Sequence, residues 1–209
     1  VLAPLALLVG MAIHLAFHRL YQVDEAQNLF MVRALAFHQG HLYFTNALLW
    51  MMGPLGWLAR SAEHAVDLFA GGRAIFLGVF WLNLLLLALN TGERLRTFRG
   101  GLVLLAAATL APLWDFGFEI RHDNLLLTGL LLLWWLGRAR PGGSRSYLLL
   151  GALGAWLPLL AFKAVAYVVP LSLAFLAFPP PGHGLTRKRA AGAWGLGFLL
   201  GALLAGIAY

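Results

Sequence analysis

Cysteine is absent from this chain, which excludes disulfide bonds and cysteine-ligated metal sites. Charge is also scarce, because only 11% of the residues are charged, against about 25% in soluble globular domains. Acidic residues number only eight of 209. Apolar residues are abundant instead: 61% of the chain is hydrophobic and its mean hydropathy is +0.81. The composition therefore predicts a polytopic membrane protein.

The positive charge is concentrated in short loops between apolar runs. The formal net charge is +7, and nine of the fifteen Lys and Arg residues lie in three such loops. These loops are residues 91–99, 138–146 and 179–190. The positive-inside rule places them in the cytoplasm, so that segment 21–73 and the turns near Arg121 and Lys163 are external. Because cations in this arrangement set membrane topology, no nucleic-acid partner is predicted.

Seven apolar runs approach the length of a membrane-spanning helix, which is about 20 residues with about 17 at the lower end. The runs are residues 1–20, 74–90, 99–114, 123–137, 147–162, 164–178 and 191–209. The sequence thus predicts an all-α fold, a polytopic transmembrane helix bundle of about seven spans. The chain begins without methionine and ends in an apolar run. We therefore expect residues 1–209 to be a piece of a longer protein, truncated at both ends and forming part of a single transmembrane domain.

The first external loop is expected to carry two short surface helices, at residues 24–38 and 63–69. Residues 42–59 between them are long and apolar enough to span a membrane. A span there would turn all three basic loops outward, against the positive-inside rule. We therefore interpret residues 42–59 as an interfacial or re-entrant segment.

Two adjacent carboxylates, Asp24 and Glu25, follow the first apolar run. Carboxylates at a membrane boundary are costly unless they are solvated, paired or used. On a helix the two side chains would point about 100° apart, so they cannot easily serve one atom together. One is a candidate base, while the other would orient a cation or metal. The alternative is that both simply favour the start of the following helix, where acids suit the N-terminal dipole.

Four further outer-face residues are candidates for substrate binding. Arg121 can pair with Asp123 or Glu119, or hold a phosphate with its planar fork. Asp123 precedes an apolar run and is equally well placed as a helix N-cap. Lys163 and Arg73 each allow two interpretations, a contact to a phosphate or a cation held at the membrane surface.

His14 and His18 share a helix face but have no third ligand, and the spacing of His38, His41 and His122 is not that of a metal site. No cofactor is therefore predicted, although a divalent metal stays open.

The order of these motifs resembles a known family. The motifs are Asp24-Glu25 after the first helix, the turn Gly40-His41-Leu42-Tyr43, Gly72-Arg73, Arg121-His122-Asp123 and Lys163. Their order is similar to the amino-terminal module of GT-C fold glycosyltransferases of the protein mannosyltransferase and aminoarabinose transferase type. That module has seven helices, with two surface helices in its first external loop, and would cover essentially this whole chain.

The resemblance implies a transferase of the cell envelope. Its donor would be a sugar on a polyprenyl phosphate, and its acceptor a hydroxyl of a lipid or protein, at the external side of the inner membrane. Asp24 would be the catalytic carboxylate, with Glu25 as its companion. The residues implied for substrate binding are Arg73, Arg121, Asp123 and Lys163.

One departure and two alternatives bear on this interpretation. Many family members carry a proline pair where this chain has Asn46-Ala47, which affects the shape of the loop and the choice of acceptor. A transporter or permease could instead use Asp24, Glu25 and Lys163 as a relay or substrate site, although its acids would be expected in mid-span. The chain could also be a non-catalytic subunit of a membrane assembly, which its outer charged residues disfavour.

Overall fold

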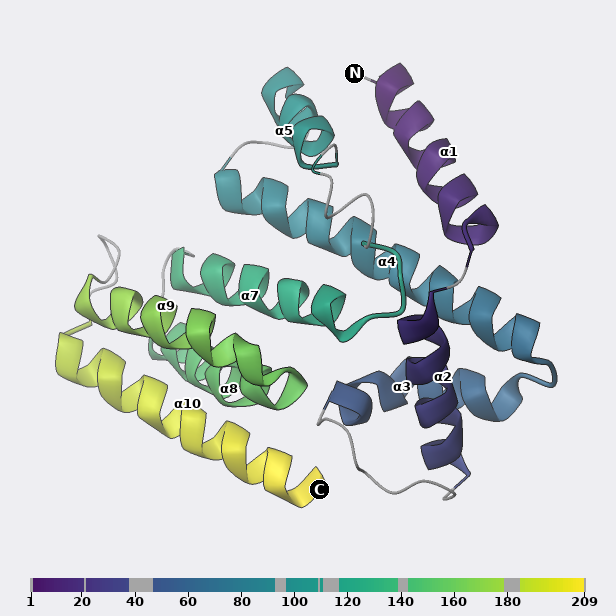
Figure 1. The fold of residues 1–209 in the computed structure, drawn as a ribbon. Helices are drawn as coiled ribbons and strands as arrows, with labels where there is room; N and C mark the ends of the chain where they lie inside the picture. The colour runs from purple at the N-terminus through teal and green to yellow at the C-terminus, as the bar shows by residue number, and fades with distance from the viewer. Residues whose placement is uncertain are drawn as a thin grey trace. The chain divides into compact units, whose positions relative to one another are not determined.

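A computed structural model describes most of the chain, and every regular element in the described residues is helical (Figure 1). The described residues are 2–20, 22–37, 47–92, 97–108, 110, 117–138, 143–178 and 185–208. The all-α prediction is therefore confirmed for this part of the chain. The predicted turn at residues 40–43, Asn46 and much of the three basic loops lie outside the described residues.

The described residues form a succession of helices. In chain order they are α1 (Leu2–His18), α2 (Val23–Ala36), α3 (Ala47–Ser61), α4 (Ala65–Thr91), α5 (Phe98–Ala108), α7 (His122–Arg138), α8 (Ser144–Leu160), the 3₁₀ helix η1 (Phe162–Ala164), α9 (Val165–Ala177) and α10 (Arg187–Ala208). They form two compact units, Val1–Thr128 and Gly129–Tyr209, each with its own packing.

The first unit is built along α4, which at 27 residues is the longest described helix (Figure 1). The first half of α4 contributes Leu68 and Phe76 to a core shared with α2 and α3. Its second half contributes Phe80 and Leu84 to another core, shared with α1 and α5. One helix is thus covered by different partners along its length, because its apolar residues are not confined to one face.

Glycines mark two places on α4 where the backbone geometry is demanding. Gly92 follows the last residue of α4 with φ of 77°, a left-handed conformation that ends the helix, and its N–H is donated to the carbonyl of Leu89. Gly72 lies beside Ile120: a Cβ built on Gly72 would lie 2.6 Å from Ile120 Cδ1. The absence of a side chain at residue 72 therefore leaves room for the Ile120 side chain against α4, one residue before Arg73.

The second unit is held by the close approach of α8 and α10. A Cβ on Gly151 would collide with the backbone of Trp194, and a Cβ on Gly197 would collide with the backbone of Leu148. The Trp156 indole N–H also donates a hydrogen bond of 2.6 Å to the carbonyl of Gly201. Small residues on both helices thus permit the backbone contact that membrane helices commonly use for association.

The number of membrane spans differs from the prediction of about seven. Among the described residues, two helices are long and apolar enough to cross a membrane, α4 and residues Arg187–Gly206 of α10. A third span results if Ala6–His18 and Val23–Ala34, which are bent by 71°, are counted as one. The other apolar runs form helices of only 11 to 17 described residues, shortened by breaks such as η1.

The first external loop also differs from the prediction. The expected surface helix at 24–38 corresponds to α2, and much of segment 42–59 lies in α3. The expected separate helix at 63–69 is wrong, because α4 begins at Ala65 and continues without a break. Arg73 therefore lies two turns inside α4 instead of opening a span, and the residues around it pack against α2 and α3.

Candidate functional site

Arg73 and Glu25 form a fully buried ion pair in the first unit. Arg73 Nε donates to Glu25 Oε1 at 2.9 Å, and Arg73 Nη2 donates to Glu25 Oε2 at 2.6 Å. This bidentate geometry is the strongest arrangement that a guanidinium and a carboxylate adopt. The pair joins α4 to the start of α2, 48 residues apart in sequence.

The same two side chains satisfy helix ends. Arg73 Nη1 donates to the carbonyls of Ala16 and Arg19 at 2.9 and 2.7 Å, and Nη2 donates to the carbonyl of Leu20 at 3.0 Å. These carbonyls belong to the last turn of α1 and the residues after it, where no intrahelical partner is available. Glu25 accepts the backbone N–H of Gln22 at 2.9 Å, as the third residue of a capping box does at the start of a helix.

Burial of Glu25 by itself would raise the pKa of its carboxyl group. The hydrogen bonds from Arg73 and from the backbone N–H groups of Gln22 and Ile120, together with the charge of Arg73, outweigh burial and lower that pKa. Glu25 is therefore a permanently ionised partner of Arg73 at neutral pH.

Asp24 is exposed, in contrast to the buried Glu25 that follows it in the sequence. Its side chain is 58% exposed, and its Oδ2 lies 3.3 Å from Arg121 Nη1. The Arg121 side chain is 28% exposed, and its Nη2 donates to Asp123 Oδ2 at 3.3 Å. Arg121 thus bridges two partly exposed carboxylates by contacts that are longer than those of the buried pair.

Segment 117–121 carries Arg121 and is anchored by amide side chains. Asn28 of α2 donates to the carbonyl of Ile120 at 2.9 Å, and Asn124 of α7 donates to the carbonyl of Glu119 at 2.8 Å. The backbone N–H of Ile120 is donated to Glu25 Oε1 at 3.2 Å. These bonds hold the two peptide groups that follow Glu119 and place Arg121 opposite Asp24.

Glu119 is a buried carboxylate in an unusual setting. Its side chain is 0% exposed, and neither of its oxygens has a hydrogen-bond donor among the described residues. Arg19 Nη1 and Arg121 Nη1 each lie 3.9 Å from it, too far for a hydrogen bond. Burial, followed by repulsion from Glu25, raises the pKa of Glu119 against the opposing effects of the arginines.

We call these side chains the charged cluster. Its members are Arg19, Asp24, Glu25, Arg73, Glu119, Arg121 and Asp123. It has a buried half, in which Arg73 and Glu25 are closely hydrogen-bonded, and a partly exposed half around Arg121. The exposed half offers a carboxylate that can accept a proton beside a guanidinium that can bind an anion.

Five of the six predicted site residues belong to the charged cluster. They are Asp24, Glu25, Arg73, Arg121 and Asp123. Lys163 belongs to the second unit, exposed in η1 between α8 and α9, and its place in a common site stays a prediction. In the described part of the chain, no group of three or more His, Asp or Glu side chains could hold a metal ion.

Several polar residues of the first unit were not singled out as functional from the sequence. Asn83 donates to the carbonyl of Asn124 at 3.1 Å, and its side-chain oxygen accepts the Thr128 hydroxyl at 2.7 Å. Asn83 is a lone polar residue within an apolar run, which is a usable signal for a buried contact. Asn28 offers no such signal, because an amide in an already polar helix is unremarkable.

Comparison with known proteins identifies no relative: no protein-family model, no curated protein and no solved structure matches this chain.

Proposed function

We propose that the chain is the amino-terminal part of a membrane glycosyltransferase of the GT-C type. It moves a sugar from a polyprenyl-phosphate donor to a hydroxyl of a lipid or protein acceptor, at the external, periplasmic face of the inner membrane. A multi-pass topology of about seven spans, with the three basic loops in the cytoplasm, is part of this proposal. The observation that supports it is the exposed Asp24 carboxylate facing the Arg121 guanidinium at 3.3 Å.

Asp24 is assigned the role of general base. The acceptor oxygen attacks the anomeric carbon of the sugar, its proton passes to the Asp24 carboxylate, and the bond from that carbon to the phosphate oxygen breaks. A base must be able to reach the hydroxyl of an incoming acceptor. Asp24 meets this condition because it is exposed, whereas Glu25 is enclosed by Arg73 and backbone donors.

Arg121 is assigned to the phosphate that leaves. Negative charge grows on the phosphate oxygens as the sugar departs, and a guanidinium stabilises such oxygens through two parallel hydrogen bonds. Arg121 contacts Asp24 and Asp123 at 3.3 Å each, and it is partly exposed. Contacts of this length at a surface are weak, so an incoming phosphate can replace one of them.

Arg73 and Glu25 are assigned a positioning role in place of direct contact with substrate. Arg73 already donates to one carboxylate and three carbonyls, and it is fully buried. Holding Glu25 inward sets the rotation of α2 at its first turn. Because the preceding residue lies about 100° around the helix, Asp24 is then directed outward to Arg121.

The test is transfer by the full-length protein in phospholipid vesicles, supplied with a radiolabelled polyprenyl-phosphate sugar and with envelope lipids or proteins as acceptors. We expect label to move from the donor to an acceptor hydroxyl, and Asp24→Asn to abolish the movement. Asp67→Asn is the matched control, because Asp67 is an exposed acid in the first turn of another helix of the same unit. Absence of transfer by the wild-type protein with all acceptor classes would overturn the proposal.

A further inference from the structure

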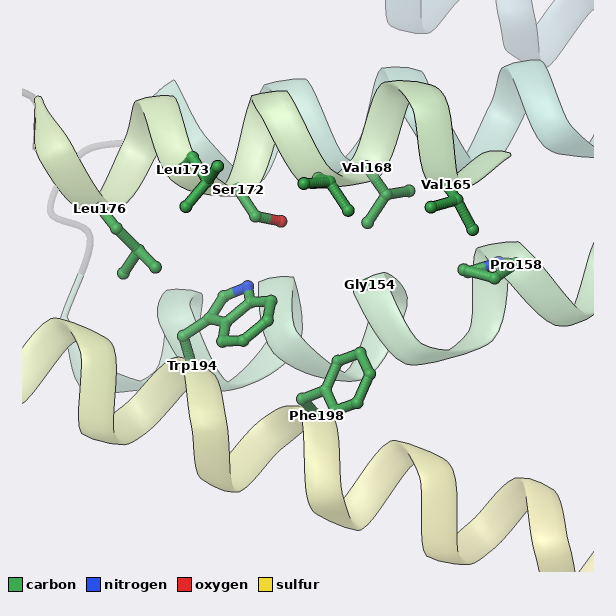
Figure 2. A pocket seen from close by; sticks show the side chains of 10 residues that line it. Gly154, Pro158, Val165, Val168, Ser172, Leu173, Leu176, Trp194 and Phe198 are labelled. Carbon is green, nitrogen blue, oxygen red and sulfur yellow. The ribbon is translucent and has the colours of Figure 1, made fainter. Parts of the chain in front are cut away.

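A cavity of about 370 Å³ lies within the second unit, between α8, α9 and α10 (Figure 2). This volume is near the lower end of the range of about 300–1,000 Å³ that is usual for ligand pockets. Nearly all of its lining is apolar, and the residues that form it include Val168 of α9 and Phe198 of α10. The residues that line the cavity belong to the second unit, whereas those of the charged cluster belong to the first.

Two hydrogen-bonding side chains lie on the cavity without a partner. Ser172 of α9 is only 6% exposed, and its hydroxyl oxygen has no hydrogen-bond partner among the described residues. The indole nitrogen of Trp194 in α10 is buried and equally unpartnered there. Figure 2 shows the two side chains pointing toward one another from opposite walls. Buried polar groups are normally satisfied, so this pair calls for an acceptor other than the described residues.

The chemistry of the two groups narrows the kind of acceptor. The Trp194 indole is a donor only, and the Ser172 hydroxyl can donate as well. A carbonyl oxygen has two lone pairs and can accept both hydrogen bonds. A pure hydrocarbon, including an isoprenoid chain, fits the apolar walls but leaves both donors unsatisfied.

The surroundings of the cavity indicate which kind of molecule carries this acceptor. Several lining residues are also exposed at the surface of the unit, among them Val169 and Leu173 of α9. Residues Arg187–Gly206 of α10, which supply the opposite wall, are long and apolar enough to cross a membrane. The molecules that reach such a wall are membrane lipids.

We infer that this cavity binds one acyl chain of a glycerophospholipid, with its ester carbonyl accepting hydrogen bonds from Ser172 and Trp194. This site is additional to the proposed transferase site and does not depend on it. The bound chain packs against α8, α9 and α10 together and stabilises the second unit.

Gly154 of α8 provides a direct way to fill the cavity. A Cβ on Gly154 would lie 3.5 Å from Val168 Cγ1 and 3.7 Å from Trp194 Cζ2, which are ordinary contacts, so a longer side chain enters the space between them. Gly195 on α10 is a matched control, because a Cβ there meets nothing within 4 Å. Gly154→Leu therefore removes the site, and Gly195→Leu leaves it intact.

The experiment measures thermal unfolding of the whole chain in detergent while phospholipid is titrated. Two lipids with identical chains and headgroup are compared, one a diester and the other a diether that lacks the carbonyls. A ligand that binds only the folded state raises the unfolding temperature. We expect the diester to reach half of its effect at a concentration at least about two- to tenfold lower than the diether does, which is the net effect of one hydrogen bond.

Four variants test whether the lipid occupies the cavity and whether its carbonyl bonds to Ser172 and Trp194. In Ser172→Ala and Trp194→Phe the preference for the diester should shrink, and in Gly154→Leu saturable stabilisation by either lipid should be lost, while Gly195→Leu behaves like the wild type. Equal stabilisation of the wild type by diester and diether would overturn the inference. An undiminished response of Gly154→Leu, or an unchanged diester preference in both Ser172→Ala and Trp194→Phe, would do so as well.

Discussion

Arg73 and Glu25 form a bidentate ion pair that is completely buried, with N···O distances of 2.9 and 2.6 Å. The pair connects three helices, because Arg73 lies in α4, Glu25 lies in α2, and the carbonyls that Arg73 also binds lie at the end of α1. An ion pair in the interior is costly to desolvate, so we expect it to add little net stability. Its expected contribution is structural specificity, because it fixes how α1, α2 and α4 pack together.

We expect Arg73→Met to lower the free energy of unfolding by about 3–5 kcal/mol, because Glu25 would remain as a buried charge without its partner. The carbonyls of Ala16, Arg19 and Leu20 would lose their donor as well. Thermal unfolding in detergent, followed by circular dichroism, measures the loss. Arg33→Met is the control, since Arg33 is a partly exposed arginine of α2. Similar losses in both variants would show that the buried pair has no special role.

Asp24→Asn distinguishes catalysis from helix capping. Asparagine retains the shape of the side chain and is a good residue at helix starts, so folding and membrane insertion should be unchanged. It cannot accept a proton at neutral pH, and loss of a general base typically lowers the rate by about 10²–10⁴-fold. The rate of sugar transfer and binding of the donor are measured on the same preparation. Normal transfer by a correctly inserted Asp24→Asn protein would reduce Asp24 to a surface acid.

Arg121 is expected to bind the donor phosphate. Arg121→Ala should weaken binding of a polyprenyl-phosphate sugar, and Arg121→Lys should restore it only in part, because lysine lacks the planar fork. Equilibrium binding of the donor in detergent provides the measurement. The contacts of Arg121 with Asp24 and Asp123 are also lost in these variants, so unfolding is measured in parallel. Donor binding that is unaffected by Arg121→Ala would remove this residue from the site.

Glu119 makes the stability of the first unit depend on pH. Its pKa is raised in the folded protein above the ordinary value of 4.5, so the folded state holds this proton over a pH range in which the unfolded state has released it. The contribution of Glu119 to stability is therefore complete below pH 4.5 and is lost as the pH rises through the folded pKa.

Glutamine cannot ionise, so Glu119→Gln should remove this loss. The stability of the variant relative to the wild type should therefore be greater at neutral pH than at acidic pH. Unfolding temperatures measured from pH 4 to pH 8, roughly the interval that contains ordinary and raised carboxyl pKa values, give the comparison. Glu25 gives the opposite pH dependence. Its pKa is lowered in the folded protein, so the stability that it contributes is lost as the pH falls through this lowered pKa. An identical pH dependence in Glu119→Gln and wild type would contradict the assignment.

The topology is testable with single cysteines, since the chain contains none. Cysteines at Glu93, Ser144 and Gly184 should resist an impermeant thiol reagent applied to intact cells, and a cysteine at Lys163 should react. Gly92 is avoided because its φ of 77° disfavours any side chain. Labelling of the three loop positions from outside would reverse the proposed orientation.

The sequence by itself determined the general character of the protein. Apolar content and sparse charge predict helices in a membrane setting, and helices make up the regular structure of the described chain. The adjacent acids Asp24 and Glu25 also stand out in the sequence. Helical geometry shows that they point apart, because successive residues differ by about 100°. This local rule cannot say which acid faces inward.

The tertiary structure decided that question, because the direction of each acid depends on residues far away in the chain. Arg73 and the backbone of Ile120, 48 and 95 residues from Glu25, hold Glu25 in the interior and leave Asp24 to Arg121. Two other features, the Glu119 carboxylate without a hydrogen-bond donor among the described residues and the cavity beside Ser172 and Trp194, also depend on the tertiary structure. Each arises where elements from different parts of the sequence pack together, and burial and hydrogen-bond satisfaction are properties of that packing.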